Sequence, residues 1–165
     1  MKKLFIFFYC ILILGIIIQC NSSGKYRIIL LPDTDKNRLT DEIPAHSGKY
    51  CCKVDSVIPF SYGISRYIKD ITNDKIKKIK VKSWVLMPVI SSEVNLVVEI
   101  KSDGKMEFYM GKSIKDFILQ ANKWTEASFE VDIPDKISKD SFLKVYLWSA
   151  NKSVAYLDNL EVTIE

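Results

Sequence analysis

The amino-acid sequence predicts an all-β protein, a jelly-roll β-sandwich of about nine antiparallel strands that follows an N-terminal signal helix. Runs rich in β-branched and aromatic residues recur along the chain, separated by turn signals such as "SDGK" and "IPDKISKD". Several runs alternate apolar and polar residues, which is the pattern of a half-buried strand. Only "SIKDFILQ" (113–120) has a helical period, and it is short. Many half-buried strands without a long helix favour two packed sheets.

The predicted strands begin after the first two dozen residues. They cover residues 26–31, 49–55, 60–68, 75–87, 94–101, 105–111, 124–133, 142–148 and 154–164. In a strand, alternate residues share a face. In the run 142–148, Tyr146 and Trp148 therefore lie on the side of Lys144, opposite the aliphatic residues. The run 75–87 likewise places Trp84 on the side of its lysines.

Composition and charge exclude several classes of protein. Of the 165 residues 48% are hydrophobic and 27% are charged, which is ordinary for a globular domain and unlike a disordered chain. The formal net charge is +4, and Lys2 and Lys3 contribute two of these charges. The 24 basic residues exceed the 20 acidic residues only slightly. So small a positive excess does not indicate a nucleic acid or an anionic membrane surface as partner.

The N-terminus has the pattern of an export signal. Two lysines precede an uncharged apolar run, Leu4 to Ile18. A membrane-spanning helix needs about 20 apolar residues, whereas the core of a signal peptide needs about 7–15. The length of the run favours a signal peptide, with an uncleaved N-terminal anchor as the alternative.

A cysteine follows the apolar run directly. Ile17, Ile18, Gln19 and Cys20 resemble the lipobox of a bacterial lipoprotein, in which the cysteine is acylated and becomes the mature N-terminus, although Gln19 departs from the usual small residue. This resemblance implies a signal peptide over residues 1–19, a tether over 20–24 and a β-sandwich domain over 25–165. Acylation would hold the folded domain at a membrane surface. A plain secretory signal with a chance cysteine is the alternative.

The remaining cysteines and the one histidine give no metal signature. Cys10 lies inside the signal core, and Cys51 and Cys52 are adjacent within "GKYCCKVDS". Neighbours in a strand point to opposite faces, so we expect one core residue and one surface thiol, without a bond between them. His46 is the single histidine and lies beside a turn, so a histidine-rich metal site is excluded and a structural role is favoured.

Four segments carry a resemblance to a known family. They are "AHSGKY" (45–50), "KKIKVKSWVLMP" (77–88), "NKWTEASFEVDIP" (122–134) and "LKVYLWSANKSVAYLDNLEV" (143–162). Their order over residues 45–164 resembles the galactose-binding-like jelly-roll modules grouped with family 4/9-type carbohydrate-binding modules. It is especially similar to accessory domains of exported proteins in the Bacteroidetes lineage. The resemblance implies a jelly-roll fold and a glycan ligand.

The last strand carries a carboxylate that needs a partner. Even positions from Val154 to Ile164 are apolar except Asp158, so alternation predicts a buried acid. The resemblance implies a structural calcium ion at this place, for which Asp158 is a candidate ligand, and the loop with Asp33 and Asp35 offers further oxygens. The alternatives are hydrogen bonds to Asp158 from backbone N–H groups or Ser47, and a β-bulge that turns Asp158 to solvent.

No catalytic signature is found, so we expect a protein that is not an enzyme. The candidate ligand-binding residues are instead the aromatic side chains on the polar sides of their strands: Trp84, Tyr109, Tyr146 and Trp148. If these strands are neighbours, the rings form a platform on which sugars stack. The alternative is that they pack under loops at the edge of the sandwich, and Trp124 is expected to fill the core or this edge.

These observations lead to one functional expectation and one alternative. The first is a lipid-anchored, non-catalytic envelope protein with a carbohydrate-binding-like module, at the bacterial outer membrane or its periplasmic face. The alternative is a structural or protein-interaction β-sandwich lipoprotein with no glycan site. Either would be a monomer, attached to the membrane by its N-terminal lipid, with a glycan or an envelope protein as partner and no nucleic acid.

Overall fold

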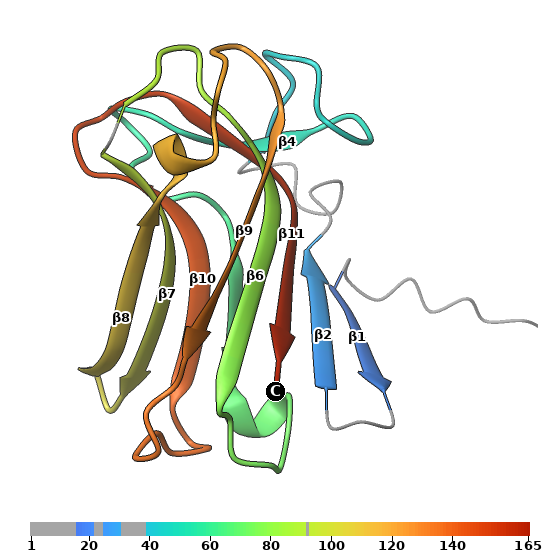
Figure 1. Ribbon diagram of the computed structural model, residues 1–165, viewed down its shortest axis with the longest axis vertical. Coiled ribbons are helices and arrows are strands. Elements are labelled where there is room, and N and C mark those ends of the chain that lie inside the picture. Colours follow the sequence, from blue (N-terminus) through green and yellow to red (C-terminus); the bar gives the residue numbers. More distant parts are fainter. Residues whose placement is uncertain (1–15, 22–24, 31–38, 92) are drawn as a thin grey trace, which may run out of the picture.

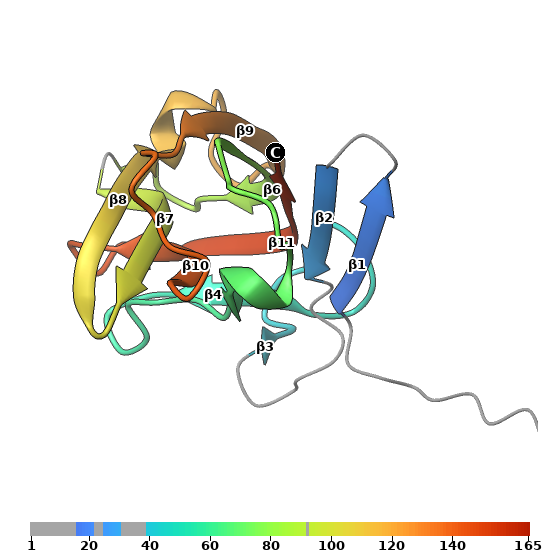
Figure 2. The same ribbon diagram turned by 90° about the horizontal axis from the view of Figure 1, so that it is seen from below.

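The computed structural model describes residues 16–21, 25–30, 39–91 and 93–165, with backbone alone for 16–21. Within these ranges the chain forms two antiparallel sheets that face each other (Figures 1 and 2). No helix among these residues is both long and apolar enough to cross a membrane. The two-sheet all-β architecture predicted from the sequence is confirmed.

The larger sheet, which we call sheet A, is built around the last strand of the chain. Strand β11 pairs on one side with β2 and β4, and on the other with β6. Strands β1, β3 and β9 extend the sheet from β2, β4 and β6. The bounds are β1 Ile16–Asn21, β2 Lys25–Leu30, β3 Leu39–Thr40, β4 Cys51–Val54, β6 Lys78–Leu86, β9 Thr125–Asp132 and β11 Ala155–Ile164.

The smaller sheet, sheet B, has the strand order β5-β10-β7-β8. Its strands are β5 Ile64–Tyr67, β7 Val94–Ser102, β8 Lys105–Ser113 and β10 Phe142–Ser149. A two-residue turn joins β7 to β8, with φ of 47° at Asp103 and 77° at Gly104. Positive φ at both central residues is typical of a type I′ hairpin, which explains the "SDGK" signal.

The core lies between the sheets and follows the alternation of the sequence. In β10, Leu143, Val145 and Leu147 are fully buried, whereas the residues between them are half-buried on the outer face. Aliphatic residues of β6 and β7 meet them from the two sheets. Each such side chain stabilises the fold by about 1.5–3 kcal/mol when it is buried.

All nine predicted strands are present, with ends shifted by a few residues. The segment 113–120 forms only a single 3-10 turn, η4 Ile114–Asp116. Strands β1 and β3 were not predicted from the sequence. Strand β1 covers the end of the predicted signal core and Cys20, and its backbone pairs with β2. Residues 1–15, where most of the signal core falls, lie outside the described residues, and export and acylation stay predictions.

Strand β11 changes phase in its middle, which the alternation argument did not foresee. Asp158 pairs with Trp84, but the next register pair with β6 is Glu161 with Lys82, so β11 has a bulge. Asn159 has φ of 48°, which asparagine tolerates better than most residues. Before the bulge Leu157 faces the core, and after it Leu160 does. The single buried face predicted from Val154 to Ile164 is therefore wrong.

Candidate functional site

The outer face of sheet B carries three of the four predicted ligand-binding residues. Alternation in β10 puts Tyr146 and Trp148 on this face, together with Lys144. Strand β7 pairs Glu99 with Lys144 on one side and with Tyr109 of β8 on the other. The register therefore brings Lys144, Glu99 and Tyr109 into one row across three strands.

Glu99 is the centre of a polar cluster on this face. Its side chain is almost buried, with 6% of the residue exposed. The Tyr146 hydroxyl donates a hydrogen bond to Oε2 of Glu99 at 3.1 Å, and Lys101 Nζ lies 2.9 Å from Oε1. Both oxygens of the carboxylate thus have a partner, which fixes its orientation.

Burial and the charge of Glu99 also raise the pKa values of Tyr146 and Tyr109. Burial raises the pKa of Tyr146 most, and the Glu99 charge and its hydrogen bond raise it further. Burial, and then the charge of Glu99, raises the pKa of Tyr109 as well. Both phenols therefore stay protonated at neutral pH and can donate hydrogen bonds.

An open cavity of about 410 Å³ lies beside this cluster. Its lining consists of Phe60, Ser61, Tyr62, Gly63, Ser65, Arg66, Glu99, Lys101, Lys144 and Tyr146. At its rim the Phe60 ring is 53% exposed and lies parallel to the Trp148 ring, with centroids 6.3 Å apart. Phe60 also meets Tyr146 edge to face at 5.8 Å. Ligand sites commonly combine aromatic walls with a few oriented polar groups, as here.

The segment 59–63 holds one wall of the cavity against β10. The backbone N–H of Ser61 donates to the Leu147 carbonyl, and the Ser61 hydroxyl accepts the Leu147 N–H, both at 2.9 Å. At Gly63 an added Cβ would lie 2.1 Å from the Val145 carbonyl oxygen. Only glycine therefore permits this close approach beside the cavity.

Trp84, the fourth predicted ligand-binding residue, lies elsewhere, on the outer face of sheet A. The His46 ring stacks on it, with centroids 3.8 Å apart, and Trp124 meets His46 edge to face. Trp124 Nε1 donates to the Pro44 carbonyl at 3.0 Å and so fastens the same loop. Trp84 packs under a loop, which was the alternative interpretation, and the four rings do not form one platform.

Asp158 lies beneath this loop and is 1% exposed. Its Oδ2 accepts the Ser47 backbone N–H at 2.9 Å, and its Oδ1 accepts the Asn159 N–H at 2.7 Å. The bulge turns Asp158 out of the core, and the loop that carries Ser47 covers it. The backbone-donor alternative and the bulge are thus both present, but the bulge does not expose Asp158 to solvent.

Burial raises the pKa of the Asp158 carboxyl, and the N–H groups of Ser47 and Asn159 oppose this rise. The Ser83 hydroxyl donates to the Asp158 carbonyl at 2.8 Å, beside the bulge in β11. No group of three or more His, Cys, Asp or Glu residues in the described part of the chain could hold a metal ion. The calcium prediction also depends on Asp33 and Asp35, which lie outside the described residues, and it stays a prediction.

The expectation of one surface thiol is wrong, because Cys51 and Cys52 are both buried. They do point to opposite faces and do not bond to each other. Cys52 lies in the main core, whereas Cys51 packs with Leu86 and Tyr156 in a second cluster on the outer side of sheet A. Residues Ile43 and Ala45 and Trp124 cover that cluster, so the outer face is closed there.

Sequence reasoning missed Phe60, Arg66, Glu99 and Lys101 at the cavity. A signal existed for Glu99, since it interrupts the apolar run "VNLVVEI". A lone acid in such a run needs a partner, as was argued for Asp158. Nothing in the sequence indicated that the segment with Phe60 pairs with the end of β10.

Comparisons with known proteins agree with the architecture. No protein-family model matches the sequence, and a comparison with curated proteins gives no significant match. Among solved structures, the CBM22-2 xylan-binding domain of Paenibacillus barcinonensis Xyn10C has a TM-score of 0.50 at 12% identity, over 92% of each chain. The C-terminal family 22 carbohydrate-binding module of Clostridium thermocellum Xyn10B has a TM-score of 0.50 at 13% identity, over 84% of this chain and 80% of that one.

A cyclase from Fischerella sp. TAU is also similar, with a TM-score of 0.46 at 8% identity, over 89% of this chain and 78% of that one. At such low identity the two matches with a TM-score of 0.50 show the fold alone. The chain therefore has a two-sheet antiparallel β-sandwich that is structurally similar to carbohydrate-binding modules.

Proposed function

We propose that this chain is a non-catalytic glycan-binding protein whose site is the outer face of sheet B. The observation that carries the proposal is the oriented Glu99 carboxylate, which Tyr146 and Lys101 hold beside an open cavity. Sugars present C–H faces to aromatic rings and hydroxyl groups to polar side chains. Phe60 and Tyr146 offer the rings, and Glu99 with its partners offers acceptors and donors.

The same site supports binding over hydrolysis. Glycoside hydrolysis commonly uses two carboxyl groups on either side of the scissile bond. Among the described residues that line the cavity, Glu99 is the single carboxylate. The similarity to binding modules supports the same conclusion at the level of the fold.

A glycan array with the full-length chain tests this proposal, in a detergent without a sugar head group. We expect at least one polysaccharide class to bind. Phe60→Ala should weaken that binding about tenfold, whereas Leu119→Ala, which trims a 95% exposed apolar side chain elsewhere, should not. An array without any bound glycan, or equal effects of the two substitutions, would reject the proposal.

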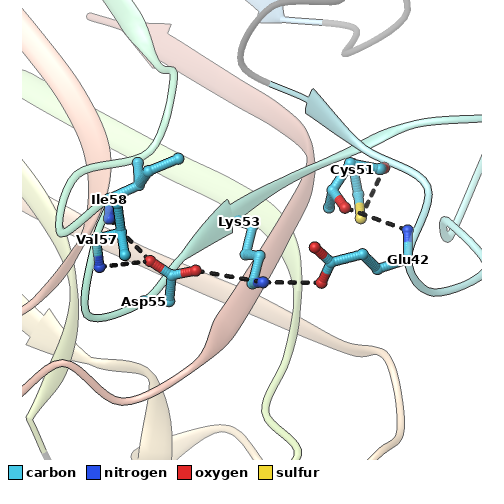
Figure 3. Close-up of polar contacts among 7 residues, drawn as sticks. Glu42, Cys51, Lys53, Asp55, Val57 and Ile58 are labelled. Carbon is cyan, nitrogen blue, oxygen red and sulfur yellow. Dashed lines mark hydrogen bonds and ion pairs between the residues drawn. The ribbon is translucent and has the colours of Figure 1, made fainter.

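A second candidate function, docking of an envelope protein, is favoured by an exposed apolar loop. Val57 is 83% exposed and Ile58 is 50% exposed. The loop is nevertheless held in place, because Asp55 Oδ1 accepts the N–H groups of both residues at 2.8 Å. Lys53 links Asp55 to Glu42, at 3.2 and 2.8 Å (Figure 3). Exposed apolar side chains on an ordered loop are typical of interaction sites.

A photo-crosslinking residue at position 57 tests this second candidate in cells that produce the protein. A specific partner should be captured from position 57 and not from position 119. If no crosslinked partner is captured from position 57 and a glycan does bind, the protein-docking function is rejected and only glycan binding is supported.

We further propose that the chain is exported and acylated at Cys20, as the lipobox resemblance implies. Labelling with a palmitate analogue tests this. Cys20→Ser should remove the label, whereas Cys10→Ser should leave it. A label that survives Cys20→Ser contradicts acylation there, and an unlabelled but membrane-bound chain would support the uncleaved anchor.

A further inference from the structure

The basic side chains on the two outer faces of the sandwich differ in their ion pairing. On sheet A the lysines of β6 all have acidic partners: Lys78 lies 3.0 Å from Glu130, Lys82 lies 2.7 Å from Glu126, and Lys80 lies 3.3 Å from Glu165. This face carries rows of opposite charge, as is usual for a solvated sheet surface.

The cavity on sheet B lacks that balance. Three cations, Arg66, Lys101 and Lys144, line it with the single carboxylate of Glu99. Lys101 pairs with Glu99 at 2.9 Å, so this pair is neutral as a unit. Arg66 and Lys144 make no ion pair with any acid in the described part of the chain. Arg66 donates to the Ser65 carbonyl, and Lys144 Nζ lies 5.8 Å from the centroid of the Phe142 ring.

Two cations without acidic partners in a concave site raise the local concentration of anions. An arginine fork matches planar oxyanions such as carboxylates, and a lysine adds a point charge. Glu99 does not oppose this, because Lys101 neutralises it. The aromatic rings of Phe60 and Tyr146 remain next to these cations and suit a sugar ring.

We infer that the ligand of this site is an anionic polysaccharide, whose carboxylate or sulfate groups bind Arg66 and Lys144 while its sugar rings contact Phe60 and Tyr146. This inference rests on the proposed glycan-binding function and narrows it to one class of glycan. Arg66 and Lys144 then bind the charged groups of the ligand. The Glu99 cluster orients its uncharged sugar surface.

Two matched pairs of polymers test the inference by titration calorimetry with the full-length chain in the same detergent. One pair is polygalacturonate and its fully methyl-esterified form, and the other is dextran sulfate and dextran. Each pair shares a backbone and differs in charge. We expect at least one charged polymer to bind about tenfold or more tightly than its neutral counterpart. The pair that shows the difference identifies the anionic group.

Charge-neutral variants locate the effect. Lys144→Gln and Arg66→Gln should each weaken binding of the charged polymer about tenfold, a larger loss than for its neutral counterpart. Lys82→Gln, which removes the same charge from sheet A, should have no effect. Urea denaturation shows whether each variant is folded. Lys144, whose side chain lies on the outer face, carries the test should Arg66→Gln unfold the domain.

Different results would reject the anionic ligand and the proposed glycan-binding function. Equal binding of charged and neutral partners, or binding of neutral glycans alone on the array, overturns the anionic assignment and leaves the glycan-binding function intact. Equal losses for Lys144→Gln and Lys82→Gln also overturn it, since the attraction would then be unspecific. An array without any bound glycan rejects the proposed function itself.

Discussion

The imidazole ring of His46 lies parallel to the indole ring of Trp84, with an interplanar angle of 11°. This stack covers the outer face of sheet A around Trp84, whereas Tyr109 is 45% exposed on the outer face of sheet B. We therefore expect Trp84 to contribute to stability and Tyr109 to contribute to the proposed glycan binding.

Trp84→Ala should lower the free energy of unfolding by about 2–3 kcal/mol, less than for a fully buried tryptophan, because Trp84 is half-buried. It should not change the glycan affinity of the folded protein. Tyr109→Ala should do the reverse, with affinity about tenfold lower and stability within about 1 kcal/mol of the parent. Urea denaturation and calorimetry measure the two quantities. Loss of affinity in folded Trp84→Ala would contradict this assignment.

Gly63→Ala should disrupt the edge of sheet B. Its new Cβ would meet the Val145 carbonyl oxygen at 2.1 Å and the Tyr146 Cβ at 2.9 Å, so β5 must move away from β10. We expect a destabilisation of about 3 kcal/mol, measured by urea denaturation. Gly111→Ala is the matched control, because its Cβ would come no nearer than 3.4 Å, to the Tyr109 hydroxyl. Equal tolerance of the two substitutions would show that β5 is not tightly packed on β10.

Asp158 should make stability depend on pH. Because burial raises its pKa in the folded protein, the folded state holds this proton more tightly than the unfolded chain does. The contribution is fully present below the unfolded pKa of about 3.9 and is lost as the pH rises through the folded pKa. Parent stability should therefore fall, relative to Asp158→Asn, as the pH rises from about 4 towards 7.

Urea denaturation across this range measures that difference. The substitution Asp158→Asn would place an amide NH₂ against a backbone N–H, so the variant should be less stable than the parent by about 1–3 kcal/mol at the acid end. The exposed Asp132 provides the control, since Asp132→Asn should follow the parent. A gap between parent and Asp158→Asn that widens as the pH rises would contradict the raised pKa.

Both buried thiols should be inert in the folded protein. Burial raises the pKa of Cys51 and of Cys52 to about 12, so only about 10⁻⁴ of each is thiolate at pH 8. Iodoacetamide followed by peptide mapping should find both unmodified without denaturant and alkylated in urea. Rapid labelling of Cys51 in the native protein would show that the loop over the second cluster opens readily.

The fold was predictable because its signals are local. Alternation in β6 and β10 gives the buried face of each strand, and the "SDGK" turn gives the hairpin that joins β7 to β8. The phase change in β11 needs the positive φ of Asn159, and alternation assumes a regular strand. A hint lay in Leu157 and Leu160, which cannot share a face in a regular strand, with asparagine between them.

The candidate site was only partly predictable, because it depends on which strands become neighbours. Alternation placed Trp84 and Tyr146 correctly on the polar sides of their strands. It could not assign those strands to different sheets, because pairing joins residues far apart in the sequence. The burial of Cys51 has the same origin, since a distant loop covers an outer face that alternation treats as solvated.

Because β1 contains residues of the predicted signal peptide, the predicted cleavage would change the edge of sheet A. It borders β2 at one edge of sheet A, and Ile16 to Gln19 provide four of the six residue pairs between the two strands (Figure 1). Cleavage before Cys20 would remove these residues and uncover the backbone N–H and C=O groups on that side of β2. Uncovered strand edges readily accept a strand from another chain. Maturation would thus expose the edge of sheet A at β2. Hydrogen exchange in residues 27–30 should then be faster in the processed protein than in the uncleaved precursor.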